Sequence, residues 1–297
     1  MSSEPSNSFL IRAAPLTFAL LWSIGFIVAK YAAPDADPFA FLTARFGLAA
    51  LILGLIALAM RAPWPTSGMG ITHSVVSGML MHGGYLAGIW WAIFAGLPAS
   101  IAGLLAAGQP LLTALLAGPL LGERVGWRHW AGIGAGFTGI VMVLLPRLAG
   151  VDAAALPGVA TPMIVAALGV VSVTLGTFYQ KRFVPRTDLR SGTCLQYLGA
   201  LALLAPLTML MGSWRFDPTV NLLIALAVSV LGLSVAGIAL LLMMIRRGEV
   251  SRVAVLIYLV PPLTAIEAFL LFGESLTVVQ VLGMAIAVVG VWLATRT

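Results

Sequence analysis

Polar side chains that interrupt long apolar stretches are the residues of this chain best suited to chemistry, and His82 and Tyr85 are the first such pair. Together with Gly78 and Trp90 they form one stripe of a helix expected at 71–95. A histidine deep in an apolar span is costly unless it has a partner or faces water. We therefore expect both side chains to hydrogen-bond a solute, with His82 also able to carry a proton. The competing interpretation is an internal histidine satisfied by a carbonyl.

An aromatic face is expected on the first apolar stretch. Trp22, Phe26 and Lys30 recur at intervals of four, which places them on one side of a helix. Directed inward, Trp22 and Phe26 could stack on an apolar or aromatic solute; otherwise they pack or face lipid. Lys30 and its counterpart Lys181 are expected to gate or anchor helix ends, where a lysine stem can reach the interface.

Two prolines stand at equivalent places in long apolar stretches. Pro110 and Pro261 each remove a backbone donor, and freed backbone at the membrane midplane is where carriers place binding sites. Gln109 and Tyr258 stand close by, and Thr177 belongs to a polar segment expected to face the same site. Proline kinks also serve as simple packing devices, and that alternative stays open.

Two charges lie well inside apolar stretches. Arg45 follows Pro38 by seven residues, and Glu267 precedes Glu274 by seven. Unpaired, each would be expensive in an apolar layer. They could pair with each other or with backbone and water, and Glu267 could carry a proton if burial favoured its neutral form. Both are candidates for coupling or gating. Glu274 itself is expected to cap the helix that follows it.

Several kinds of chemistry are missing from the sequence. No Gly-x-x-x-x-Gly-Lys-Ser/Thr phosphate cradle occurs, and neither a Gly-x-Ser-x-Gly motif nor an acidic pair at metal-ligand spacing is present. We expect no catalytic residues, no metal, no cofactor and no ATPase. The net charge of +6 comes from basic residues at helix ends rather than from a basic patch, so nucleic acid is not an expected partner.

The candidate residues are positioned by a chain of membrane composition. It is 61% hydrophobic and 9% charged, and stretches of roughly 20 apolar residues can cross a bilayer. The expected all-α integral membrane fold has ten transmembrane helices. They are predicted at 10–33, 38–60, 71–95, 98–120, 126–146, 161–183, 191–212, 219–245, 250–273 and 277–295.

The two halves of the chain are copies of one unit. A shift of 151 residues aligns them without a gap at many positions of low side-chain freedom. The identities are Gly25/Gly176, Lys30/Lys181, Pro34/Pro185, Asp37/Asp188, Ser100/Ser251, Pro110/Pro261, Thr113/Thr264, Gly122/Gly273, Glu123/Glu274, Gly132/Gly283 and Gly139/Gly290. We expect a first repeat at 1–147, a connecting loop at 148–160 and a second repeat at 161–297.

An odd number of helices in each copy makes the copies inverted repeats, a geometry suited to alternating access. Basic residues are retained on the cytoplasmic side. With the N-terminus inside, twelve Lys and Arg residues fall in cytoplasmic segments and three outside. Both termini are then cytoplasmic. Glycines of the fifth and tenth helices favour close helix contact, within the bundle or between protomers of a homodimer.

The chain resembles the EamA domain of the drug/metabolite transporter superfamily over its whole length. The resemblance is carried by Trp22-Ser23-Ile24-Gly25-Phe26, Lys30, Pro38, Arg45, Pro110 and Gly122-Glu123. The second copy keeps Gly176, Lys181, Pro261 and Gly273-Glu274 but has Val173, Thr174 and Gln196 where the first has Trp22, Ser23 and Arg45. The resemblance implies a ten-helix exporter of amino acids, metabolites or drugs, and within the family it is closer to YddG-type aromatic amino acid exporters than to sugar-nucleotide carriers.

The resulting hypothesis is a bacterial inner-membrane, multi-pass exporter of small organic solutes. Amino acids, aromatic or otherwise neutral, and related metabolites are the expected substrates, bound at the midplane and released by alternating access. The bilayer, the solute and, in an antiport cycle, protons are its partners. A multidrug exporter, a passive facilitator and, more distantly, an intramembrane enzyme are the alternatives.

Overall fold

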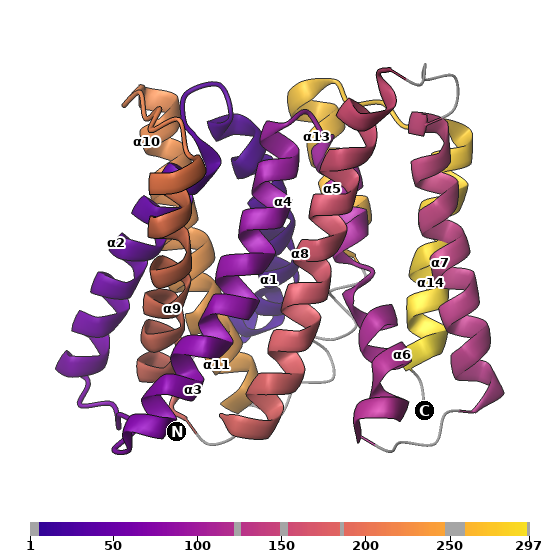
Figure 1. Ribbon diagram of the computed structural model, residues 1–297. Coiled ribbons are helices and arrows are strands. Elements are labelled where there is room, and N and C mark those ends of the chain that lie inside the picture. The colour runs from indigo at the N-terminus through magenta and orange to yellow at the C-terminus, as the bar shows by residue number, and fades with distance from the viewer. Residues whose placement is uncertain (1–5, 122–125, 149–153, 185–186, 247–258, 296–297) are drawn as a thin grey trace.

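Helices make up the ordered structure of this protein. The computed structural model describes residues 6–121, 126–148, 154–184, 187–246 and 259–295, and Figure 1 shows their arrangement as a bundle. Within these ranges the sole β-type pairing is an isolated bridge between Ala36 and Phe216. The all-helical class predicted from the sequence is therefore confirmed for the described part of the chain.

The first half begins with two long helices and continues in shorter pieces. Its elements are α1 (Ser6–Ala32), α2 (Pro38–Ala59), α3 (Gly68–Gly78), the π-helix η1 (Met79–Gly84), α4 (Tyr85–Phe94), α5 (Ala99–Ala106), α6 (Gln109–Leu121) and α7 (Trp127–Leu148). The second half comprises α8 (Leu156–Phe183), α9 (Leu189–Met211), α10 (Val220–Ala227), the π-helix η2 (Val228–Ala236), α11 (Gly237–Arg246), α13 (Val260–Phe272) and α14 (Val278–Thr295).

Four of the described helical stretches are both long and apolar enough to cross a membrane. They are Pro38–Ala59, Leu156–Phe183, Leu189–Met211 and Val220–Leu241, the last formed by α10, η2 and part of α11. Shorter apolar helices cover Leu16–Ala32, Ala99–Thr113, Trp130–Pro146, Val260–Phe272 and Val278–Leu293. The helical run 68–94 coincides with the span expected at 71–95. The count of ten spans stays a prediction.

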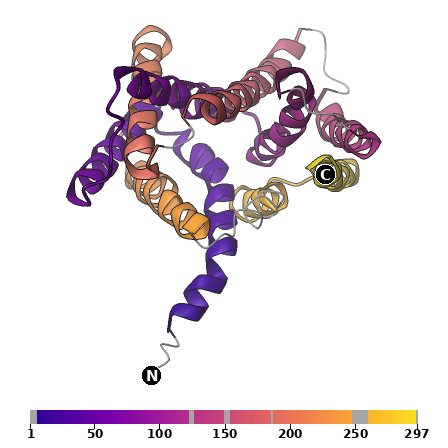
Figure 2. The same cartoon turned by 90° about the horizontal axis from the view of Figure 1, so that it is seen from below.

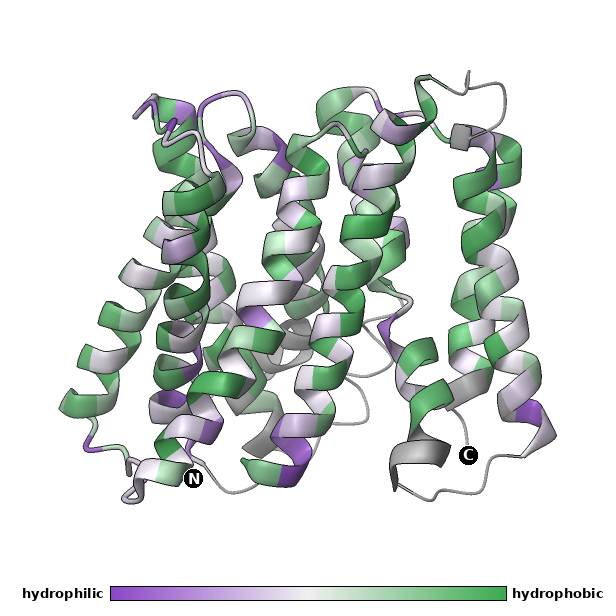
Figure 3. Cartoon of the chain, in the orientation of Figure 1, coloured by the Kyte–Doolittle hydropathy of each residue, from purple (hydrophilic) through white to green (hydrophobic). Residues whose placement is uncertain are grey.

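The outer surface of the bundle is strongly apolar. Leu51, Leu55 and Leu58 of α2 are each more than half exposed, and so are Leu270 and Leu271 of α13. In the cartoon of Figure 3, green hydrophobic and pale colours run along most of each helix, and the strongest hydrophilic colours lie mostly near helix ends. A soluble protein rarely exposes so much contiguous apolar surface, and a lipid environment accounts for it.

Two aspartates at the repeat offset begin equivalent helices. Asp37 caps α2 by accepting hydrogen bonds from the backbone N–H of Phe39 (2.9 Å) and Ala40 (3.1 Å). Asp188 caps α9 by accepting from the backbone N–H of Arg190 at 2.9 Å. Each satisfies N–H groups that a helix start leaves without partners. The Asp37/Asp188 identity thus corresponds to one structural role performed in both halves.

The helix expected at 98–120 is broken rather than kinked. The chain leaves the helix after Ala106 and re-enters it at Gln109, so Pro110 stands in the first turn of α6. Proline is well tolerated there because the first turn has no N–H partner to lose. Pro261 likewise lies in the first turn of α13. Both prolines therefore begin described helices, and at Pro110 the packing alternative of a kink inside one continuous helix is not the arrangement observed.

Glycine allows two helix pairs to approach unusually closely. A Cβ on Gly199 of α9 would lie 2.0 Å from the carbonyl oxygen of Val75 of α3. Gly139 of α7 and Gly283 of α14 meet in the same way, and these two helices lie side by side in both views (Figures 1 and 2). The glycines of α7 and α14 therefore pack inside the chain, as one of the two sequence interpretations expected. The homodimer stays a prediction.

Gly199→Ala is expected to destabilise the protein by about 1–3 kcal/mol, because the added methyl group meets backbone that cannot move aside. Gly47→Ala in α2 is the matched control, since a Cβ there meets nothing within 4 Å. Thermal unfolding of the two purified variants in the same detergent compares them. Equal midpoints would contradict the close packing of α3 against α9.

Candidate functional site

A cavity of about 240 Å³ lies inside the bundle, enclosed by residues of both halves. We call it the central cavity, and it is lined by Trp22, Gly25, Phe26, Arg45, Met81, His82, Tyr85, Leu86, Ile89, Trp90, Gln109, Val173, Tyr197, Leu233 and Ile238. These residues come from α1, α2, η1, α4, α6, α8, α9, η2 and α11. Most of the lining is apolar or aromatic with a few polar groups, as in small-molecule sites generally.

Five residues expected to bind substrate line the central cavity. They are Trp22, Phe26, His82, Tyr85 and Gln109. Trp22 and Phe26 stand one turn apart on α1, and His82 and Tyr85 are three residues apart across the junction of η1 and α4. The fold therefore brings together five residues that the sequence placed in three separate apolar stretches.

Two π-helical segments contribute to the cavity wall from equivalent places in the repeat. His82 lies in η1, and Leu233, at the offset of 151 residues, lies in η2. A π turn places an extra residue in the helix and redirects the side chains that follow it, and such turns are frequent at functional sites. Sequence periodicity alone did not reveal either segment.

His82 is held by a polar and aromatic environment. A ring nitrogen, Nε2, is 3.3 Å from Oε1 of Gln196, and the amide nitrogen of Gln196 donates to Ser77 at 3.4 Å. The imidazole also meets the Tyr197 ring edge to face, with 5.0 Å between centroids. The histidine thus has a side-chain partner rather than the backbone carbonyl that the competing interpretation required, and it still faces the cavity.

Arg45 is a buried cation on the cavity wall. Its side chain lies on α2, and the residue is only 6% exposed. The Nε atom donates to the Ser234 hydroxyl at 3.3 Å, and the guanidinium carbon is 5.3 Å from the centroid of Phe46 and 5.7 Å from that of Trp90. These contacts are a weak hydrogen bond and cation–π contacts with two rings.

Glu267 is separate from Arg45. Its Oε1 accepts a hydrogen bond from the Ser23 hydroxyl at 2.7 Å, which joins α13 to α1. Its other oxygen, Oε2, is buried and has no hydrogen-bond partner among the described residues. In the described part of the chain the two charges form no ion pair with each other. Of the alternatives left open by the sequence, mutual pairing is therefore not the arrangement observed.

The remaining candidates are placed differently. Thr177 accepts a hydrogen bond from the amide nitrogen of Gln109 at 3.2 Å, so it supports the cavity wall from behind. Pro110 follows Gln109 in α6 but is not a lining residue. Pro261 lies instead beside a small apolar void with Leu104 and Ile140. Tyr258 lies outside the described residues.

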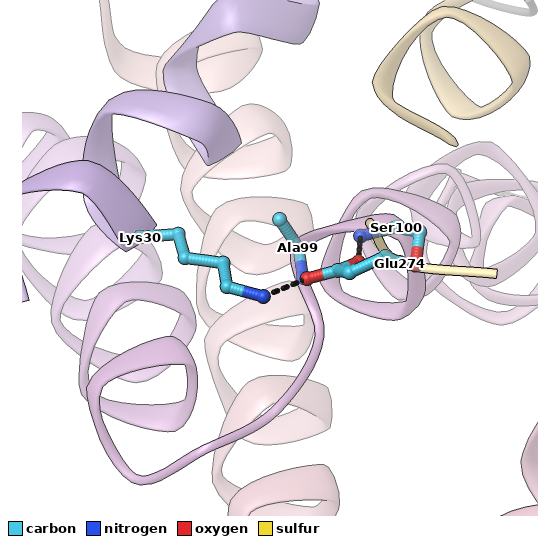
Figure 4. Close-up of polar contacts among 4 residues, drawn as sticks. All are labelled: Lys30, Ala99, Ser100 and Glu274. Carbon is cyan, nitrogen blue, oxygen red and sulfur yellow. Dashed lines mark hydrogen bonds and ion pairs between the residues drawn. The ribbon is translucent and has the colours of Figure 1, made fainter. Parts of the chain in front are cut away.

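Lys30 forms an ion pair at one end of the bundle, shown in Figure 4. Its partner Glu274 also accepts hydrogen bonds from the backbone N–H of Ala99 (3.1 Å) and from the backbone N–H (3.2 Å) and hydroxyl (2.8 Å) of Ser100. Glu274 therefore caps α5, in the other half, and not the helix that follows it, which corrects the sequence expectation. The lysine is also 4.9 Å from the centroid of Phe272. Lys181 is exposed near the end of α8.

Sequence reasoning missed Tyr197, which lines the central cavity, and Ser234, which accepts a hydrogen bond from the cavity residue Arg45. The role of Ser234 follows only from the structure of η2, because in the sequence no feature distinguishes it from other serines in apolar stretches. Tyr197 directly follows Gln196, the repeat counterpart of Arg45. Two adjacent polar residues at the position that matches Arg45 were the sequence signal that could have identified Tyr197. Among the described residues, no group of three His, Cys, Asp or Glu is placed to hold a metal.

Comparison with known proteins decides the family. The model of the EamA-like transporter family matches residues 12–145 and again 160–296, which together make up most of the chain. The chain belongs to the EamA-like transporter family. Its apolar helices are accordingly those of a membrane transporter.

Relatives of this EamA-like transporter carry transport names. An Escherichia coli protein named "Probable amino-acid metabolite efflux pump" is 26% identical over 293 residues, covering 94% of this chain and 92% of its own length. The "Uncharacterized transporter YvbV" of Bacillus subtilis is 24% identical over 290 residues, covering 92% and 88%. A crystal structure of 23% sequence identity has a TM-score of 0.65 and covers 95% of each chain, which shows the shared fold.

The contacts of Glu274 make the stability of the folded protein depend on pH. Burial alone would raise the pKa of Glu274, but hydrogen bonds from Lys30, Ser100 and Ala99 together outweigh it and hold the pKa below its ordinary value of 4.5. A carboxyl group whose pKa is lowered by folding stabilises the folded state at pH values above its ordinary pKa. This contribution is lost as the pH falls through the lowered pKa.

Wild type is therefore expected to unfold at a higher temperature than Glu274→Gln at neutral pH, and this advantage should shrink as pH falls below 4.5. Asp217→Asn removes a carboxylate from an exposed ion pair and is the control, with little change expected at any pH. Thermal unfolding across a pH series provides the measurement. An advantage of wild type that persists undiminished in acid would contradict the assignment.

Proposed function

We propose that this EamA-like transporter exports small organic solutes across the bacterial inner membrane, with neutral amino acids, aromatic ones included, and related metabolites as substrates. The single observation that carries the proposal is the central cavity, because aromatic walls and a few polar groups from both halves surround one space. The name of the Escherichia coli relative points to the same class of solute.

The dimensions of the cavity favour an amino acid over a larger drug. Pockets for drug-sized ligands span roughly 300–1,000 Å³, whereas the central cavity holds about 240 Å³. Trp22, Phe26 and Trp90 offer apolar surface for a side chain, and Tyr85 and Gln109 offer hydrogen bonds. A multidrug exporter would need a larger cavity than the one this conformation contains.

In the proposed cycle the cavity opens alternately to the two sides of the membrane. Ten spans arranged as two inverted repeats, with both termini cytoplasmic, provide the necessary symmetry. Lys30 and Glu274 join α1 to the start of α5 and to the segment after α13. We propose that this contact closes the outer end and must break when the cavity opens outward, with Lys181 acting at the inner end.

Glu267 supports proton antiport over facilitated diffusion. Its buried Oε2 has no hydrogen-bond partner in the described part of the chain, which is costly when the carboxylate is charged, and a proton would remove that cost. The contact with Ser23 links the carboxyl group to α1, the helix that carries Trp22 and Phe26. Proton binding at Glu267 can thus affect α1 and the cavity-lining residues that this helix carries.

The proposed site is tested by uptake of radiolabelled tryptophan, phenylalanine and threonine into proteoliposomes. His82→Ala combined with Tyr85→Phe should reduce transport of the preferred solute about tenfold or more, since hydrogen bonds to a charged group are lost. His73→Ala is the control, because His73 contacts Tyr179 rather than the cavity. Unchanged transport and binding of every solute in the double variant would refute this site. Absence of flux for all solutes with wild type would refute the amino-acid assignment.

The coupling role makes a separate prediction. With an imposed proton gradient, wild type should accumulate its solute, whereas Glu267→Gln should transport it at a rate independent of the gradient, because the side chain can no longer exchange a proton. Solute exchange without a gradient should continue in the variant. Gradient dependence retained by Glu267→Gln would assign coupling elsewhere, and gradient independence of wild type would indicate a facilitator.

A further inference from the structure

We infer that Arg45 binds the carboxylate of the transported solute, and that the central cavity recognises apolar monocarboxylates without requiring an ammonium group. The inference rests on the proposed function and specifies the chemistry of its substrate. It also gives Arg45 a binding role in place of the coupling or gating role expected from the sequence.

The first argument is the state of the arginine. Arg45 is 6% exposed, and its hydrogen bonds within the described residues involve only Nε, which donates to Ser234. The ion pairs of the described part of the chain join other residues, so this buried cation has no carboxylate partner there. A buried unpaired charge is costly, and an anionic ligand arriving from the cavity would remove that cost.

The second argument is the charge of the wall. Arg45 is the single permanently charged residue of the described cavity lining, and neither aspartate nor glutamate belongs to that lining. The nearby acidic groups are engaged elsewhere: Glu267 bonds Ser23, and Glu274 bonds Lys30 and the start of α5. A carboxylate therefore meets an opposite charge in the cavity, whereas an ammonium group meets no negatively charged residue in the described lining.

The third argument is how the guanidinium is held. Ser234 of η2 accepts from Arg45 through its hydroxyl and accepts from the Tyr197 hydroxyl (3.4 Å) through its carbonyl. The rings of Phe46 and Trp90 flank the guanidinium. The terminal nitrogens remain without protein hydrogen bonds in the described residues, which suits the paired geometry that arginine offers a carboxylate.

The apolar part of the ligand follows from the remaining wall. Trp22, Phe26, Ile89 and Leu233 provide hydrophobic and aromatic surface in the same cavity as the arginine. The ligand class is therefore a carboxylate attached to an apolar or aromatic body of about amino-acid size. An α-amino group is tolerated, since Tyr85 and Gln109 can accept hydrogen bonds, but the structure provides no charge for it.

Three ligands with one shared body separate the contributions. They are L-phenylalanine, 3-phenylpropionate, which lacks the amino group, and phenethylamine, which lacks the carboxylate. Binding to purified protein is measured by the change in tryptophan fluorescence, because Trp22 and Trp90 line the cavity. We expect 3-phenylpropionate to bind at least as tightly as phenylalanine, and phenethylamine to bind about tenfold more weakly or worse.

Variants test whether Arg45 is responsible. Arg45→Gln should weaken both carboxylates about tenfold or more while leaving phenethylamine unchanged or improved. Arg45→Lys retains the charge and should keep the preference for carboxylates over phenethylamine, which provides a test even if Arg45→Gln fails to fold. Arg215→Gln, at an exposed ion pair, is the matched control and should bind all three as wild type does.

The inference is overturned if phenethylamine binds wild type as tightly as phenylalanine, if 3-phenylpropionate binds tenfold more weakly than phenylalanine, or if Arg45→Gln weakens all three ligands equally. Failure of wild type to bind any of the three would also overturn it. These outcomes leave the proposed function standing so long as wild type transports an amino acid in proteoliposomes. Loss of that transport activity in wild type would overturn the proposed function itself.

Discussion

The cost of placing charge inside an apolar helix bundle governs how this protein is built. Charges at the helix ends are neutralised locally: Asp37 and Asp188 cap α2 and α9, and Glu274 meets both Lys30 and the start of α5. In the interior, Ser234 and two aromatic rings surround Arg45, and the hydrogen bond described for Glu267 comes from Ser23. The interior groups are thus less completely satisfied than the terminal ones. Incomplete satisfaction inside a membrane protein is where ligands and protons act.

The two halves of the chain contribute different residues to the cavity and its surroundings at matching positions. Gln196 stands where the first half has Arg45, and Leu233 stands where it has His82. Yet Gln196 contacts His82 directly, so the two copies contribute complementary residues to one network. One copy supplies the cation and the imidazole, and the other supplies a neutral amide and an apolar wall. Divergence between repeats has therefore produced an asymmetric site within a symmetric sequence framework.

Composition and the positions of polar residues could predict a good deal of this molecule. His82 and Tyr85 were selected as polar interruptions of an apolar stretch, Trp22 and Phe26 for their spacing and Gln109 for its place beside Pro110, and the fold collects all five around one cavity. Pro110 and Pro261 show the limit of that reasoning. A proline removes the same donor whether it kinks a helix or begins one, and only the neighbouring backbone decides between them.

Contacts between distant segments were beyond the reach of the sequence. The capping of α5 by Glu274 joins residues 174 or more positions apart, and no local pattern encodes such a partner. Ser234 escaped notice for a related reason, since its role depends on a π turn that hydrophobic periodicity does not register.

The two π turns also bear on how sequences of this kind should be aligned. A π turn accommodates an extra residue in a helix, and one residue corresponds to a rotation of about 100° around an α-helix. Both halves of this chain carry a π turn at the same place, and they align there without a gap. A relative whose helix is regular at η1 would need a one-residue deletion in the alignment, and omitting it would assign the roles of His82 and Tyr85 to residues that face another direction.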